Sequence, residues 1–201
     1  MKTGNRSRRT TLLGLLTAIL MVFGLTPLGY LNIGPLAISF NMIPVAIGAA
    51  ALGPVGGAIL GAVFGMTSFL QCLGIGGSSY MGVILFDINP LFAFIQRFVP
   101  RVMAGFLVGV IYQLARKVCK PGLAGSIAGF CAAMLNTVLF MSALILLFGN
   151  TQYLTDLIAG RNVVVFVCTF VGVNAVAEAL AATAVTGALT AALERSGLLR
   201  R

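Results

Sequence analysis

The residues of this sequence that are most able to do chemistry are the ionisable side chains within long apolar stretches. Arg97 and Arg101 lie four residues apart in one such stretch, and Glu178 lies in another. Four residues are about one helical turn, so the two arginines would share a helix face and together bind an anionic group. Two structural alternatives are an ion pair between Arg101 and Glu178, and an Arg97 side chain that extends to the lipid head groups.

Neutral polar residues in the apolar stretches and their connections extend this candidate site. Amides and hydroxyls at these positions would hydrogen-bond either a ligand or a neighbouring helix. Asp87 is a further polar residue in the same connection as Tyr80, and Phe40, Phe64 and Phe69 are candidates for the apolar wall of a pocket. The predicted ligand-binding residues are Arg101, Arg97, Asn41, Gln71, Tyr80, Asn89, Asn136, Asn174 and Glu178.

The residue types needed for catalysis or metal binding are scarce. The chain has no histidine, and its four cysteines form no CxxC pair, which argues against a zinc site and a Cys/His nucleophile. It contains neither GxSxG nor GxxxxGK[ST], so nothing points to a serine hydrolase or to ATP binding. The sequence predicts a non-enzyme without cofactor or metal, in which any energy for transport comes from another protein.

The elements that must position these residues are membrane-spanning helices. Hydrophobic residues make up 59% of the chain and charged residues 8%, against about 25% charged in soluble domains. Apolar runs long enough to span a bilayer predict an all-α integral membrane protein, a single membrane domain over 1–201 with six transmembrane helices. The predicted helices are 11–30, 36–52, 55–73, 91–115, 122–148 and 163–193, the second kinked or partly irregular at Pro44.

The basic residues set the predicted orientation. The basic amino-terminus precedes an apolar run, but no convincing cleavage site follows, so a retained first helix is expected rather than a signal peptide. With both termini in the cytoplasm, ten of the thirteen basic residues fall on the inner side, as the positive-inside rule requires. These ten are Lys2, Arg6, Arg8, Arg9, Arg116, Lys117, Lys120, Arg195, Arg200 and Arg201.

This topology brings the ionisable residues to similar depths. Arg101 and Glu178 would lie roughly 15 Å and roughly 22 Å along two helices that enter from the same outer side. The clustered placement of the basic residues, with no interleaved aromatic residues, argues against nucleic acid and favours contact with the lipid bilayer.

Glycines shape the connections and the helix contacts. The outer connection 74–90 is rich in glycine and is predicted to be either a lid or a simple mobile loop. The other outer connections are 31–35 and 149–162. Small residues recur at every fourth position, which allows close helix packing in lipid. They are Gly53, Gly57, Gly61 and Gly65 in the third helix, Gly105 and Gly109 in the fourth, and Gly14 and Ala18 in the first.

Four stretches carry a family resemblance. They are NIGP at 32–35, FNMIPVAIGA at 40–49, LGPVGGAILG at 52–61 and VPRV at 99–102. In their order and spacing, over most of the chain, they resemble the substrate-binding (S) subunits of energy-coupling factor (ECF) transporters, the bacterial vitamin importers. The resemblance implies a six-helix bundle in the bacterial plasma membrane, with a vitamin pocket that opens outward and is closed by the first and third outer loops.

The resemblance also implies partners and a mechanism. The partners are a transmembrane coupling subunit and two ATPase subunits, and the mechanism is a toppling of the whole bundle coupled to ATP hydrolysis elsewhere. A small-xxx-small pair on the first helix of this family docks on the coupling subunit. Gly14 and Ala18 match that spacing, with glycine where alanine is usual.

The substrate implied by the resemblance is pantothenate or another small anionic vitamin. The stretch around Asn41 and the Gly53-Pro54 step look most like the pantothenate-type members, although asparagine stands where histidine is more often found. A carboxylate would suit Arg101. The alternatives are an S subunit for folate, riboflavin, pyridoxine or a queuosine precursor, or a stand-alone channel or secondary transporter.

Overall fold

The computed structural model describes residues 2–26, 29–33, 36–76, 79–158 and 163–197. This part of the chain is helical apart from one short hairpin and the turns between elements. The elements are α1 Lys2–Leu25, β1 Tyr30–Ile33, β2 Leu36–Ser39, α2 Met42–Leu52, α3 Pro54–Leu70, η2 Gln71–Leu73, α4 Tyr80–Ile88, α5 Pro90–Ala115, α6 Pro121–Phe148, α7 Gln152–Ile158 and α8 Val163–Arg195.

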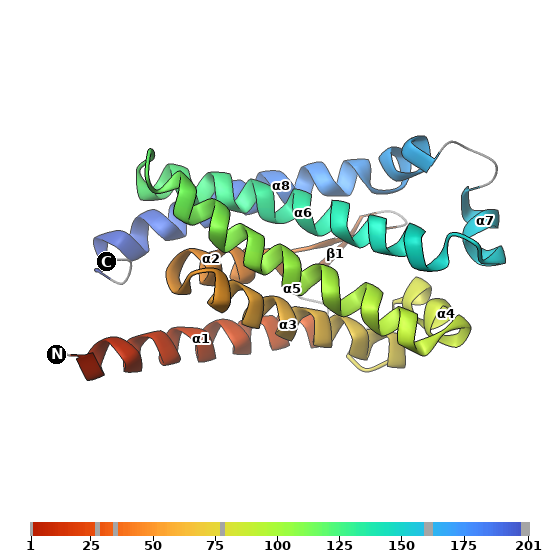
Figure 1. The fold of residues 1–201 in the computed structure, drawn as a ribbon, viewed down its shortest axis with the longest axis horizontal. Helices are drawn as coiled ribbons and strands as arrows, with labels where there is room; N and C mark the ends of the chain where they lie inside the picture. Colours follow the sequence, from red (N-terminus) through yellow and green to blue (C-terminus); the bar gives the residue numbers. More distant parts are fainter. Residues whose placement is uncertain (1, 27–28, 34–35, 77–78, 159–162, 198–201) are drawn as a thin grey trace.

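The long helices lie side by side in one elongated bundle (Figure 1). Helix α1 begins and α8 ends at one end of the bundle, which we call the termini end. The short helices α4 and α7 lie at the opposite end, which we call the α4 end. Contacts between α3 and α5, between α6 and α8 and between α5 and α6 join the long helices.

The helix lengths match those of a multi-pass membrane protein. Within the described ranges, five helical segments are long and apolar enough to cross a bilayer. They are Ser7–Leu25, Pro54–Leu73, Pro90–Ala115, Pro121–Phe148 and Ala175–Arg195. Helix α2 is apolar but has only 11 residues, so it is shorter than the 17 residues expected for 36–52.

A hairpin replaces the carboxyl end of the first expected helix and the start of the second. Strands β1 and β2 pair antiparallel, with Tyr30 opposite Ser39 and Ile33 opposite Leu36. Helix α1 begins earlier than expected, at Lys2. It ends at Leu25 rather than at position 30, because a proline at 27 disfavours helix in the residue before it. Pro44 lies in the first turn of α2, where its missing N–H removes no helical hydrogen bond.

Two of the expected outer loops contain helices. The connection 74–90 includes α4, whose first turn is capped by Ser79: its Oγ accepts the Gly82 N–H over 3.3 Å. The connection 149–162 includes α7. Both helices are short, nine and seven residues, which is why length alone did not reveal them.

Glycines bring the long helices into close contact, as their spacing predicts. A Cβ at Gly57 would collide with the carbonyl oxygen of Gly105, and a Cβ at Gly61 would collide with that of Arg101. The α3–α5 contact therefore depends on the missing side chains. The α6–α8 contact is similar, because a Cβ at Gly129 would collide with the Ala182 carbonyl.

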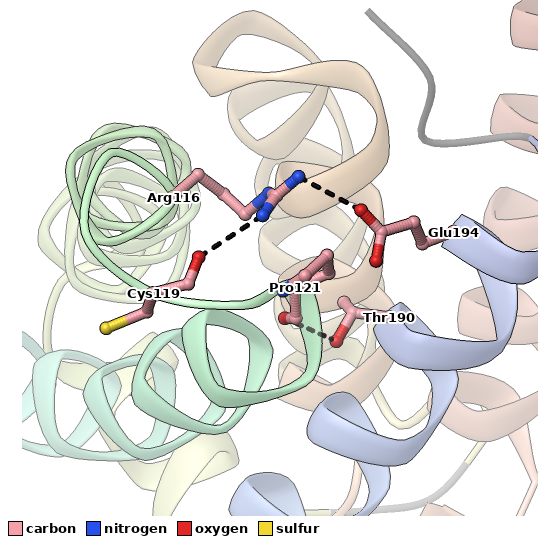
Figure 2. Close-up of polar contacts among 5 residues, drawn as sticks. All are labelled: Arg116, Cys119, Pro121, Thr190 and Glu194. Carbon is pink, nitrogen blue, oxygen red and sulfur yellow. Dashed lines mark hydrogen bonds and ion pairs between the residues drawn. The ribbon is translucent and has the colours of Figure 1, made fainter.

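Polar contacts tie the α5–α6 turn to α8 at the termini end (Figure 2). Arg116 donates to a carboxylate oxygen of Glu194 over 3.2 Å and to the Cys119 carbonyl over 3.2 Å. Thr190 donates to the Pro121 carbonyl over 3.3 Å. Both side chains of the ion pair are partly exposed, so the pair stabilises the fold little, by about 0–1 kcal/mol, and mainly fixes the geometry of the turn.

Candidate ligand-binding site

Two apolar clusters are separated by a band of polar side chains. The main cluster includes Ala104 and Val108 of α5 and Ala128 and Ala132 of α6. The cap cluster, at the α4 end, includes Ala93 of α5, Met141 and Leu144 of α6 and residues of α4 and α7. Between these positions along the helices lie Arg97 and Arg101 of α5 and Asn136 of α6. We call Asn41, Arg97, Arg101, Asn136 and Glu178 the polar layer.

Arg101 is held from three helices. Its side chain is only 5% exposed, and Nη1 donates to the Gln96 carbonyl over 3.2 Å. Its guanidinium carbon lies 4.2 Å from the ring centre of Phe140 on α6 and 5.3 Å from that of Phe64 on α3. Both distances are within the range of cation–π attraction, so this charge is fixed in position before any ligand arrives.

Arg97 lies one turn nearer the α4 end and is equally buried, at 6% exposed. It donates to Ser68 Oγ of α3 over 3.3 Å and to Ser79 Oγ over 3.1 Å. Its guanidinium carbon lies 5.4 Å from the ring centre of Phe140. The two arginines therefore share one aromatic ring, and Arg97 also connects α3 to the start of α4.

Glu178 joins α8 to the hairpin. Its Oε1 accepts the Ser39 N–H over 2.6 Å. Ser39 Oγ in turn accepts a hydrogen bond from Nδ2 of Asn41 over 3.2 Å. Through Ser39, Glu178 is thus connected to β2 and to the start of α2, whereas the ion pair between Arg101 and Glu178 stays a prediction.

Two amide oxygens of the polar layer are left without donors. Oδ1 of Asn41, a fully buried residue, and Oδ1 of Asn136 accept no hydrogen bond from any residue that the structure describes. A buried acceptor without a donor costs about 1–3 kcal/mol. A bound molecule that carries hydroxyl or amide N–H groups would satisfy both oxygens.

Three predicted residues, Gln71, Tyr80 and Asn89, do not join the polar layer. Gln71 donates to the Gly24 carbonyl over 2.6 Å and so fastens α1 to the end of α3. Tyr80 is 82% exposed. Asn89 caps α5, with Oδ1 accepting the Phe92 N–H over 3.1 Å. The side chain of Asn174 lies outside the described residues.

Several residues of the site were not predicted from the sequence. Phe140 lies four residues after Asn136 and so on the same face of α6, a signal that was present but not specific. Ser68 and Ser79 were not considered, because a serine in a helix or a cap usually bonds its own backbone. Gln96 is fully buried, with both side-chain polar atoms lacking a partner among the described residues. Phe64, a candidate for the pocket wall, does contact Arg101.

A separate surface lies on α1. No atom lies within 4 Å of a Cβ built at Gly14, and Ala18 is exposed. Leu15 is 57% exposed, and Met21 and Val22 are each 48% exposed. We call Gly14, Leu15, Ala18, Met21 and Val22 the α1 face, an apolar stripe on the outside of the bundle that holds both members of the small-residue pair.

Comparison with known proteins identifies the family. A family model described as "ECF transporter, substrate-specific component" matches residues 8–190. One relative, the pantothenic acid transporter PanT of Lactococcus lactis subsp. cremoris (strain MG1363), is 26% identical over 96% of this chain and 96% of its own length. Because the family match spans both the polar layer and the α1 face, this multi-pass membrane protein belongs to the family of substrate-specific components of ECF transporters.

Proposed function

We propose that the chain is the vitamin-binding subunit of an ECF-type importer in a bacterial plasma membrane, with pantothenate as its substrate. The observation that carries this proposal is the buried guanidinium of Arg101 between the rings of Phe64 and Phe140. A positive charge that is fixed in a low-dielectric interior attracts an anion more strongly than one in water.

The charged residues of the polar layer favour an anionic ligand. The chain has four acidic residues. Glu194 pairs with Arg116 at the termini end, and Asp87 and Asp156 are exposed. Glu178 is therefore the one acidic residue of the polar layer, which also contains two buried arginines. The carboxylate of a ligand would add a second acidic group to this layer.

Pantothenate supplies the groups that this site lacks. It has one carboxylate for the arginines, and its hydroxyl and amide N–H groups are donors for the amide oxygens of Asn41 and Asn136. The Lactococcus relative is named for pantothenic acid. In this proposal Arg101 binds the carboxylate, Asn41 and Asn136 bind the neutral part of the vitamin, and Glu178 aligns Arg101 and the hairpin.

The α1 face is the proposed contact for the rest of the importer. Small side chains at Gly14 and Ala18 allow a partner helix to approach closely, and nothing in the described chain covers them. The proposed partners are a transmembrane coupling subunit and two ATPase subunits, which supply the energy for uptake.

The test is isothermal titration of the purified, folded protein with a panel of water-soluble vitamins that includes pantothenate, folate, riboflavin and pyridoxine. We expect tight binding of pantothenate and far weaker binding of the others. Tight binding of a different vitamin would show that this vitamin, not pantothenate, is the substrate. The absence of binding to every vitamin of the panel would contradict the proposed function. Uptake by cells without the ATPase subunits would contradict the importer assignment.

A further inference from the structure

The ring of Phe140 lies beside both guanidinium groups of the polar layer. Its centre is 4.2 Å from the guanidinium carbon of Arg101 and 5.4 Å from that of Arg97. The two arginines come from one helix and the ring from another, so the contact joins α5 to α6 at the depth of the proposed site. Arg101 has a second ring, Phe64, at 5.3 Å, and Arg97 also donates to the hydroxyls of Ser68 and Ser79.

An aromatic ring stabilises a buried cation in a different way from a carboxylate. The face of the ring carries a partial negative charge and attracts a guanidinium, yet the ring has no net charge. The ring therefore attracts the guanidiniums without adding a negative charge of its own. A second acidic residue at this position would pair with the arginines and compete with the carboxylate of a ligand, whereas a ring adds no such competitor.

We infer that Phe140 is a positioning residue that sets the preference of this site for an anionic ligand. It holds the guanidiniums of Arg97 and Arg101 beside one ring and stabilises their charge without adding a carboxylate that would compete with that of the ligand. This inference rests on the proposed function, in which that carboxylate belongs to pantothenate. Phe140 would affect vitamin binding by positioning the two arginines and not by contacting the vitamin.

The inference is tested by comparing two ligands that differ in charge. Pantothenol is pantothenate with an uncharged alcohol in place of the carboxylate, so the ratio of the two dissociation constants measures how much the carboxylate contributes. We expect the wild-type protein to prefer pantothenate. Phe140→Leu, which keeps an apolar side chain of similar bulk but removes the ring, should reduce that preference about tenfold, whereas Phe140→Tyr should keep it.

A second substitution keeps the shape of the ring. Trifluorophenylalanine incorporated at position 140 preserves packing but withdraws electron density from the ring face, so it should weaken the preference for pantothenate even if the leucine variant does not fold. Phe94→Leu is the matched control. Phe94 packs against Phe69 and Phe98, so its loss should lower stability and leave the ligand preference unchanged.

The outcomes separate this inference from the proposed function. If Phe140→Leu and the fluorinated ring leave the preference intact, or weaken both ligands by the same factor, Phe140 has only a packing role and the inference is wrong. A folded wild-type protein that binds neither ligand would overturn the proposed substrate together with the inference. One that binds pantothenol as tightly as pantothenate would overturn the inference and the role of the carboxylate, but not the substrate.

Discussion

Arg97 donates a hydrogen bond to Ser79 Oγ over 3.1 Å, and the same oxygen caps α4 by accepting the Gly82 N–H over 3.3 Å. A hydroxyl oxygen has two lone pairs and can accept both. Nη1 of the same guanidinium donates to Ser68 Oγ on α3. One buried side chain of α5 therefore fastens the start of α4 to α3 across the glycine-rich connection.

Loss of either partner should loosen α4. Hydrogen bonds to charged groups contribute about 1.5–3 kcal/mol, and loss of the N-cap costs about 1 kcal/mol more. We expect Arg97→Met and Ser79→Ala to speed amide hydrogen exchange in Tyr80–Ile88. The double variant should exchange little faster than the faster single variant. Asn89→Ala, which removes the cap of α5 instead, is the control, and exchange in α4 that does not respond to Arg97→Met would contradict this role.

Arg101→Ala should weaken pantothenate binding at least about tenfold, since it removes a charged hydrogen-bond donor from the site. Arg101→Lys keeps the charge but lacks the planar group that packs between two rings, so it should restore only part of the affinity. Titration calorimetry measures both. The melting temperature of each variant shows whether it is folded, and unchanged affinity in a folded alanine variant would remove Arg101 from the site.

The hairpin should keep its structure when Glu178 is replaced by glutamine and should lose it when Glu178 is replaced by alanine. Glutamine retains an oxygen that can accept the Ser39 N–H, now 2.6 Å from Glu178 Oε1, whereas alanine leaves that N–H without its acceptor. Hydrogen exchange at Ser39 should therefore rise in Glu178→Ala and stay near the wild-type rate in Glu178→Gln. Equal exchange in the two variants would show that the hydrogen bond does not hold the hairpin.

Gly14→Leu together with Ala18→Leu should abolish vitamin uptake while leaving vitamin binding intact. Both positions face away from the rest of the described chain, so the larger side chains fit in the isolated subunit but block close approach of another helix. Binding is measured by calorimetry and uptake with a radiolabelled vitamin in cells. Normal uptake by a variant that binds normally would exclude the α1 face as the docking surface.

The long apolar runs determined most of the fold. Hydropathy and length predict spanning helices because a helix in lipid must satisfy its own backbone hydrogen bonds. The four-residue spacing of Gly57 and Gly61 likewise predicts a close helix contact, and the structure places it between α3 and α5. The hairpin was missed, because its stability comes from pairing Tyr30 with Ser39 and from the contact with Glu178, not from the local pattern.

The charged and amide residues of the polar layer were readable from the sequence, but their partners were not. Charged and amide side chains in apolar runs stand out because burying them is costly, so Arg97, Arg101, Asn41, Asn136 and Glu178 could all be named. Spacing along one helix does not say which neighbour a side chain meets. Glu178 bonds a residue 139 positions away, and Gln71 fastens α1 through a carbonyl 47 positions away. Only the packing of the helices decided that Arg101 lies between two rings.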